Sequence, residues 1–142
     1  MQTWTYTGRR EVPVAPSQLQ DLPDPMLLQD MDAAAVVVSK TIIDKKPIVI
    51  FADFDCDGIT GGVILRTALT RMGGNPVLFI PNRVKDGHGL HAHRALEICR
   101  ATGAGLVITV DNGTAKGADI DKIQEDGIPV VVTDHHSLSD PL

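Results

Sequence analysis

Short runs of consecutive apolar residues alternate with segments of helical periodicity between residues 47 and 133. The apolar runs do not alternate with polar positions, which is typical of strands buried on both faces of a parallel sheet. The segments between them end at glycine or before proline, as helices commonly do. The pattern predicts strands at 47–53, 76–80, 106–110 and 129–133, and helices at 31–44, 59–72, 91–101 and 115–126.

This order of elements predicts an α/β fold with three layers, in which a mainly parallel sheet is covered by helices on both faces. Right-handed crossovers between parallel strands would place the helices there. Residues 1–30 contain four prolines and no sustained period. We therefore expect an extended lead-in at 1–30 and one domain at 31–142.

Composition narrows the class of protein. Hydrophobic residues make up 43% of the chain and charged residues 22%, as in a soluble globular domain, and no apolar run approaches the roughly 18 residues of a membrane span. The net charge of −5 argues against a broadly basic nucleic-acid binder, although much of it comes from aspartates that cations would neutralise. Cys56 and Cys99 form no disulfide framework or CxxC pair, which indicates buried thiols in a reducing cytoplasm.

Acidic side chains follow three of the four predicted strands. Asp53, Asp111 and Asp134 stand at the strand ends; the first begins the run Asp-Phe-Asp-Cys-Asp-Gly, and the last precedes two histidines. Because parallel strands end at one edge of a sheet, we expect these side chains to converge. Two carboxylates about 4 Å apart repel by roughly 4 kcal/mol at an effective dielectric of 20, so the cluster requires cations unless several groups stay protonated.

The ligand types indicate a divalent metal centre. Carboxylates with one or two imidazoles suit Mn²⁺ or Mg²⁺, and Zn²⁺ is compatible. A bridging carboxylate would hold two ions roughly 3.5–4 Å apart, as in two-metal phosphoesterases. Gly58 and Gly113 allow sharp turns into helices whose N-termini favour an anion, with Thr114 and Ser137 as candidate N-caps. The pattern predicts metal-dependent phosphodiester hydrolysis.

Two other families share part of this pattern. The run D-x-D-x-D-G matches the start of an EF-hand loop, but its twelfth position is Ile64, where that loop needs a bidentate glutamate. A haloacid-dehalogenase-type phosphatase has a nucleophilic aspartate in D-x-D and requires Thr or Val two positions after the second aspartate. In this chain that position is Asp57. Taken singly, Asp111 fits an ordinary turn and the histidine pair an ordinary surface loop. Their position on neighbouring strand ends favours a shared site.

Basic residues in the polar loop after the second strand fit either a phosphate contact or a solvated surface. These residues are Arg83, Lys85 and His88. Basic residues on the helices are predicted to be solvated: His91, His93, Lys116 and Lys122.

Several motifs in order along the chain resemble those of the DHH phosphoesterases, and most closely those of the RecJ-type single-strand-specific DNA exonucleases. The lead-in from Leu22 to Met31 also resembles that branch, so the similarity runs from about residue 20 to the end. The motifs are Asp53-Phe-Asp-Cys-Asp-Gly-Ile-Thr60, Pro81-Asn-Arg83, Asp86-Gly-His-Gly-Leu90, Val110-Asp-Asn-Gly113 and Thr133-Asp-His-His136.

The resemblance implies 5′→3′ hydrolysis of single-stranded DNA with Mn²⁺ or Mg²⁺, in DNA repair or recombination, by in-line attack of metal-activated water without a covalent intermediate. It implies that Asp111 bridges two ions, that His136 contacts the scissile phosphate and that Asp134 orients the histidines. The implied metal ligands are Asp55, Asp57, Asp111 and His135, with Asp53 beside them as a further ligand or as a residue that supports the ligands. The implied catalytic set is Asp55, Asp57, Asp111, Asp134, His135 and His136. The implied substrate contacts are Arg83, His88, Gly89 and His136, with His88 standing where the family usually has tyrosine.

Members of the family continue past the DHH motif with a further aspartate ligand and a second, substrate-gripping domain. We therefore expect residues 31–142 to be a DHH domain without that last motif and without the C-terminal domain. Two hypotheses follow. The first is a RecJ-like nuclease acting on single-stranded DNA or short oligonucleotides. The second is a non-catalytic or split-enzyme module that binds nucleic acid or a partner protein completing the site.

Overall fold

The computed structural model describes residues 22–136 of the chain. The chain divides into two units, Met1–Met31 and Asp32–Leu142. In the first unit, the described residues include a 3-10 turn, η2 (Pro25–Leu27), whose N-cap Asp24 accepts a hydrogen bond from the Met26 N–H. Ser137, a candidate N-cap in the sequence, lies outside the described residues.

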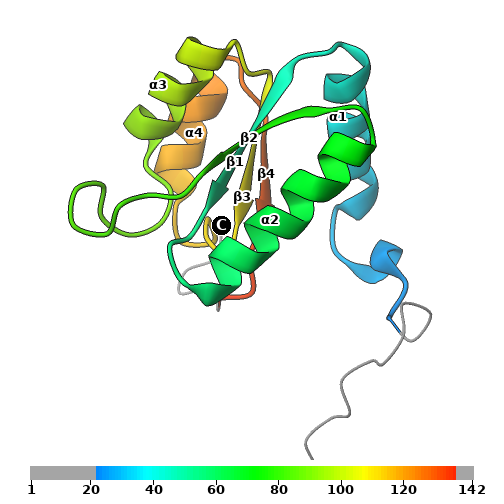
Figure 1. Ribbon diagram of the computed structural model, residues 1–142, viewed down its shortest axis with the longest axis horizontal. Helices are drawn as coiled ribbons and strands as arrows, with labels where there is room; N and C mark the ends of the chain where they lie inside the picture. Colours follow the sequence, from blue (N-terminus) through cyan, green and yellow to red (C-terminus); the bar gives the residue numbers. More distant parts are fainter. Residues whose placement is uncertain (1–21, 137–142) are drawn as a thin grey trace, which may run out of the picture. The chain divides into compact units, whose positions relative to one another are not determined.

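The second unit is an α/β domain whose four strands are all parallel, in the order β2-β1-β3-β4 (Figure 1). This confirms the predicted fold class. The elements are α1 (Met31–Ile43), β1 (Pro47–Ala52), α2 (Cys56–Arg71), β2 (Asn75–Phe79), α3 (Ala92–Thr102), β3 (Leu106–Val110), α4 (Gly117–Glu125) and β4 (Val130–Thr133).

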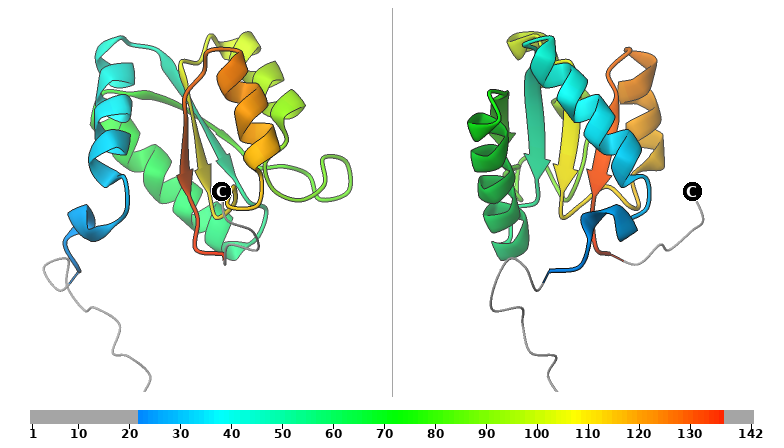
Figure 2. Two further views of the ribbon diagram at one scale, coloured as in Figure 1. Left: turned by 180° about the vertical axis from the view of Figure 1, so that it is seen from behind. Right: turned by 90° about the vertical axis from the view of Figure 1, so that its right-hand side faces the viewer.

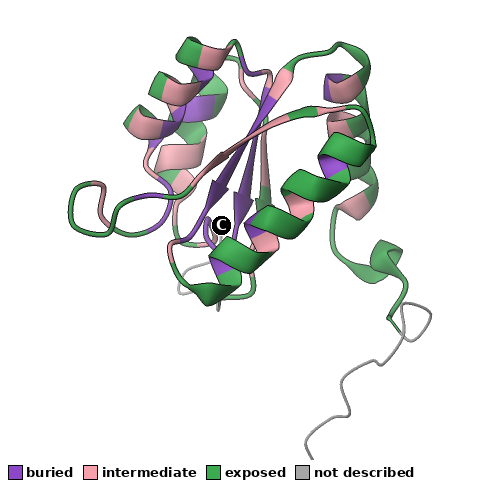
Figure 3. Cartoon of the chain, viewed as in Figure 1, coloured by how far each residue is buried: buried purple, intermediate pink, exposed green. Residues whose placement is uncertain are grey.

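Side chains of the central strands point alternately to two cores, one on each face of the sheet. Val49 and Phe51 of β1 pack in the core that α3 and α4 cover, whereas Ile48 and Ile50 pack in the core that α1 and α2 cover. All four are fully buried, and each such side chain contributes roughly 1.5–3 kcal/mol through removal from water. Figure 2 shows helices on both sides of the sheet, and Figure 3 shows burial concentrated in β1 and β3. The three-layer prediction is confirmed.

Two helices begin two or three residues away from the predicted start. Helix α2 begins at Cys56 rather than at residue 59, since Asp55 caps it. Helix α4 begins at Gly117 rather than at residue 115, and its N-cap is Lys116, not Thr114. Cys99 is buried as predicted, but Cys56 is exposed because it lies in the first turn of α2. Within residues 22–136, no helix combines the length and apolar character needed to cross a membrane.

Candidate metal centre

Three aspartates occupy neighbouring positions at the carboxyl edge of the sheet. Asp53, Asp111 and Asp134 directly follow β1, β3 and β4, and the register pairs Val110 with Thr133. Backbone hydrogen bonds extend the ladder by one residue: the Asp53 N–H donates to Val110 O (3.0 Å) and the Asp111 N–H to Thr133 O (2.9 Å). The sheet itself therefore brings the three residues together, as the strand pattern predicted.

The turn between β1 and α2 adds another carboxylate to this edge. Asp55 Oδ1 accepts hydrogen bonds from the N–H groups of Asp57 (3.0 Å) and Gly58 (3.1 Å), which caps the helix. The Gly58 bond is the largest cause that holds the pKa of Asp55 below its usual value. A Cβ at Gly58 would collide with the backbone of Asp53, so glycine permits this tight approach.

Asp111 is the most unusual residue of the site. Its φ of 62° lies in the left-handed region, which aspartate adopts more readily than most residues with a side chain. It is 7% exposed, and neither carboxylate oxygen has a hydrogen-bond partner among the described residues. Burial raises the pKa of Asp111, and the nearby carboxyl of Asp55 raises it further. The polar groups nearest to this buried carboxylate are other potential metal ligands, among them Nε2 of His135 at 2.8 Å from Oδ1, so the geometry favours a bound cation.

Asp134 organises the histidine pair rather than joining the ligand groups. Its Oδ1 accepts hydrogen bonds from the N–H groups of His135 (2.8 Å) and His136 (3.1 Å) and lies 2.6 Å from Nδ1 of His136. Its Oδ2 accepts from the Thr114 N–H at 3.0 Å. Burial alone would raise the pKa of Asp134, but the bonds from Thr114 and His136 outweigh it and lower that pKa well below its usual value. The same contact raises the pKa of His136.

Two groups of potential metal ligands meet at Asp111. One consists of Asp53, Asp55 and Asp111, and the other of Asp111, His135 and His136; in each, one ligand atom per residue lies within 4.8 Å of the others. Oxygen ligands 2.0–2.6 Å from one divalent ion lie at most about 4–5 Å apart, so each group fits around an ion. Together with the unpaired oxygens of Asp111, this donor set suits Mn²⁺ or Mg²⁺.

Asp57 belongs to neither of these groups. It lines a hollow of about 300 Å³ with Asp111, Thr133, Asp134 and His135. Its backbone N–H is used by the cap of α2. Its role as a metal ligand stays a prediction.

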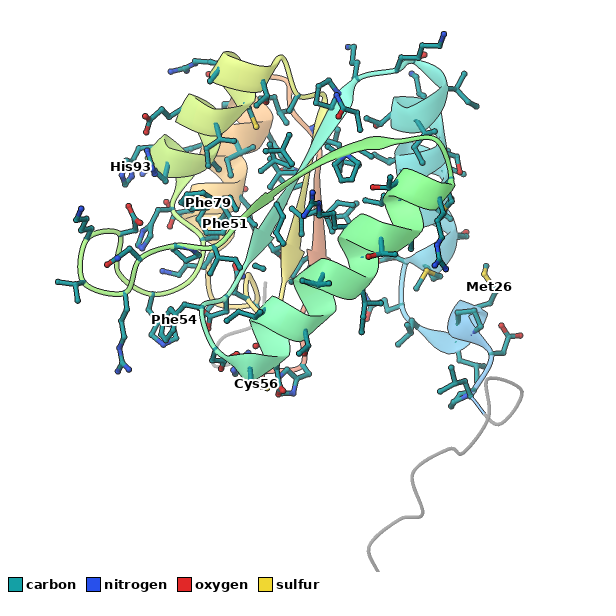
Figure 4. All side chains as sticks on the ribbon, viewed as in Figure 1. Met26, Phe51, Phe54, Cys56, Phe79 and His93 are labelled. Carbon is teal, nitrogen blue, oxygen red and sulfur yellow. The ribbon has the colours of Figure 1, made fainter. Side chains whose placement is uncertain are left out.

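The loop between β2 and α3 places His88 beside the centre and Arg83 farther out. His88 Nδ1 lies 3.7 Å from Oδ2 of Asp53, and its ring meets Phe54 edge-on at 4.7 Å between centroids. The Arg83 guanidinium lies over the ring of Phe54, 5.3 Å from the ring centroid. Figure 4 shows Phe54 at the end of the molecule toward which the strands run. Sequence reasoning missed Phe54, although it lies inside the acidic motif.

A second hollow, of about 290 Å³, lies next to Asp53 and Asp111 and is lined in part by His88, Gly89 and Lys116. Lys116, which was predicted to be a solvated helix residue, is half-buried and lines this hollow. The turn that follows β3 delays the start of α4 and brings Lys116 to the site, with its N–H bonded to Gly113 O at 2.9 Å.

Asn112 also has a role beyond the turn that the sequence suggested. It is buried, and its Nδ2 donates to Phe51 O (3.0 Å) and Val110 O (2.9 Å), which ties the ends of β1 and β3 together. Its Oδ1 has no partner among the described residues. In the sequence, this role could be inferred only from the residue type. An asparagine that is buried after a strand needs several hydrogen bonds for its amide group.

The fold and the site together define a class: a parallel α/β domain with a carboxylate and imidazole metal centre at the carboxyl edge of its sheet. Comparison with known families agrees, since the DHH family, N-terminal domain, matches residues 47–142. The chain belongs to the DHH family.

Curated relatives are named single-stranded-DNA-specific exonuclease RecJ. The protein of Dickeya dadantii is 40% identical over 134 residues, which cover 94% of this chain and 23% of the relative. Those of Escherichia coli and Thermus thermophilus are each 34% identical, over 81% and 83% of this chain and 20% and 18% of the relatives. The chain therefore spans less than a quarter of the length of these relatives.

Solved structures give the same likeness. A crystal structure of exonuclease RecJ bound to manganese matches with a TM-score of 0.74 and 33% identity, covering 84% of this chain and 30% of that one. RecJ of Thermus thermophilus in complex with Mn²⁺ matches with a TM-score of 0.67 and 31% identity, over 80% of this chain and 16% of that one. The predicted resemblance to RecJ-type proteins is confirmed.

Proposed function

We propose that this chain carries the metal-dependent centre of a RecJ-like exonuclease that hydrolyses single-stranded DNA in the 5′→3′ direction with Mn²⁺ or Mg²⁺. The observation that carries the proposal is Asp111, a buried carboxylate that is shared by two groups of potential metal ligands. The relatives' name as single-stranded-DNA-specific exonucleases and the manganese in the similar structures support it.

In this proposal, Asp53 and Asp55 hold one ion with Asp111, and His135 holds the other with Asp111. Bound divalent ions would act as Lewis acids on the phosphoryl oxygens and supply an activated water. Asp57 lines the same hollow as His135 and Asp111, which supports a contribution to the second ion.

His136 would contact the scissile phosphate. Asp134 occupies its Nδ1, so Nε2 is the ring nitrogen left for the substrate. Asp134 is in turn held by the Thr114 N–H, so its position relative to the histidine is set on both sides. Its low pKa keeps the carboxylate charged over the range in which the histidine titrates.

Arg83 and His88 would contact the nucleotide from the loop after β2, with Gly89 allowing a close approach of the backbone. The cluster of Arg83, Phe54 and His88 offers an aromatic and cationic surface next to Asp53, as single-strand binding requires. We also propose a cytoplasmic location and a role in DNA repair or recombination. Both free cysteines and the names of the relatives support these two proposals.

The second candidate is a binding module that works with a partner protein. Val36 and Ile43, seven residues apart on one face of α1, are 67% and 76% exposed, and Ile64 on α2 is 70% exposed. Exposed apolar side chains of this kind suit a protein contact. A module of this type would bind metal without releasing nucleotides.

Release of mononucleotides from 5′-labelled single-stranded DNA tests the two candidates. The proposal expects release by the wild type with Mn²⁺ or Mg²⁺, none with a chelator, and a fall to the chelator level in Asp111→Asn. Asparagine tolerates the left-handed backbone as aspartate does, so the variant removes the charge with little strain. Asp121→Asn on the exposed side of α4 is the matched control and should keep wild-type release. Metal binding without any release would instead support the binding module.

A further inference from the structure

The hollow beside the metal centre is lined both by aspartates and by a lysine. The aspartates are Asp53, Asp111 and Asp134, and the lysine is Lys116. A space with both charges in its lining suits a ligand that carries an anion and sits next to metal ions. A phosphate group of a nucleotide has this character.

The position of Lys116 is set by its backbone and by a close glycine. Its N–H donates to Gly113 O, and its carbonyl accepts from Asp119 and Ile120 in the first turn of α4. A Cβ at Gly89 would lie 3.0 Å from Cε of Lys116, so the bare glycine backbone makes room for the lysine stem. The lysine stem therefore lies against the loop after β2, where both Gly89 and Lys116 line the hollow.

The ammonium of Lys116 has no acidic partner in the described part of the chain. No carboxylate oxygen there lies within 4.0 Å of its Nζ, although lysines that line acidic sites commonly form such pairs. Asn112, which is buried in the wall of the same hollow, also keeps an unpaired Oδ1. Polar groups in this wall are therefore still available to a ligand.

Arg83, the cation that the sequence favoured for phosphate contact, is placed differently. Its guanidinium lies over the ring of Phe54, and it is not among the residues that line this hollow. A phosphate held in this hollow would therefore be contacted by groups other than Arg83.

We propose that Lys116 is a substrate-binding residue, whose ammonium holds a non-bridging oxygen of the nucleotide phosphate in the hollow between Gly89 and Asp111. This inference rests on the proposed function, because it names the group that receives the phosphate of the same reaction. It assigns the contact to a lysine at the N-terminus of α4, in addition to the histidine and arginine contacts proposed above.

Binding of dTMP to the Mn²⁺-loaded protein, measured by calorimetry, tests the proposal without requiring hydrolysis. Lys116→Met keeps the stem that packs on Gly89 and removes the charge. We expect it to weaken dTMP binding by about tenfold, the size of one charge-assisted hydrogen bond, and Lys116→Arg to restore most of the affinity. Lys122→Met, an exposed lysine of the same helix, is the control and should bind as the wild type does. Circular dichroism and Mn²⁺ titration establish that each variant is folded and loaded.

The outcomes separate this inference from the proposed function. Equal dTMP affinity of Lys116→Met and wild type, or no dTMP binding by the loaded wild type, would overturn the role of Lys116. If single-stranded DNA is hydrolysed, the Lys116→Met variant should show a raised KM with a smaller change in kcat; an unchanged KM would also overturn it. Lys116-dependent dTMP binding by a protein that releases no nucleotides would keep the phosphate site and remove the nuclease proposal.

Discussion

Nε2 of His135 lies 2.8 Å from Oδ1 of Asp111, yet the two atoms do not form a hydrogen bond of acceptable geometry. Both residues also belong to one group of potential metal ligands, so a cation at this place would be held by both side chains. Asp111 reaches this position because it follows β3 in a left-handed conformation, and His135 because it follows β4 by two residues. The metal centre is thus a product of the strand ends and of the turns after them.

Replacing Asp134 by asparagine should weaken Mn²⁺ binding by about 10–100-fold while leaving the fold intact. The carboxylate receives three hydrogen bonds from the His135–His136 segment and one from Thr114, so its charge orients the histidines. Calorimetric titration with Mn²⁺ measures the change. Asp126→Asn, at an exposed position after α4, is the matched control. Wild-type affinity in Asp134→Asn would show that the histidines hold their positions without it.

Gly58→Ala should destabilise the domain by roughly 1–3 kcal/mol, since the added Cβ collides with the backbone of Asp53. Helix propensity alone predicts the opposite sign, because alanine favours a helix over glycine by about 1 kcal/mol. Urea unfolding followed by circular dichroism distinguishes the two. Thr67→Ala, at an exposed position in the same helix, should change stability little. A gain in stability from Gly58→Ala would mean that the turn before α2 is looser than described.

The two cysteines should differ in reactivity. Cys56 is exposed and should be alkylated quickly by iodoacetamide, whereas Cys99 should react only on unfolding. Mass spectrometry of the labelled peptides measures both rates, and labelling in urea provides the control. Comparable rates in the folded protein would contradict the burial of Cys99 in the core under α3.

The free energy of unfolding should also fall at alkaline pH because of Cys99. Burial raises the pKa of its thiol to about 11, from an ordinary value of 9.0 that applies to the unfolded chain. The stability that comes from keeping the thiol neutral is therefore complete below pH 9 and is lost as the pH rises toward 11. Urea unfolding at pH 8 and pH 10 checks this, with Cys99→Ala as the comparison. An equal loss in Cys99→Ala would assign the effect to other groups.

The strand ends were predictable from the sequence because continuous apolar runs are typical of strands buried in a parallel sheet. The carboxyl ends of such strands lie at one edge of the sheet. That reasoning placed Asp53, Asp111 and Asp134 together at the carboxyl edge of the sheet. It also gave the three layers, since helices must cover both faces of such a sheet.

Turn geometry was less predictable, and the residues that depend on it were missed. Lys116 reaches the hollow only because the turn after β3 postpones α4 by two residues, which propensity does not determine. Cys56 is exposed because Asp55 caps α2 earlier than the apolar period begins. Phe54 contacts Arg83 and His88 across a loop, and such a pairing has no periodic signal in the sequence.

Calorimetric titration of the wild type and of Asp111→Asn with Mn²⁺ tests the central claim most directly, with Asp121→Asn as the control. The wild type and the control should bind Mn²⁺, and Asp111→Asn should lose binding at both ligand groups, because both contain Asp111. Binding by Asp111→Asn with the affinity and stoichiometry of the wild type, or no binding by the wild type, would contradict a metal centre built on Asp111.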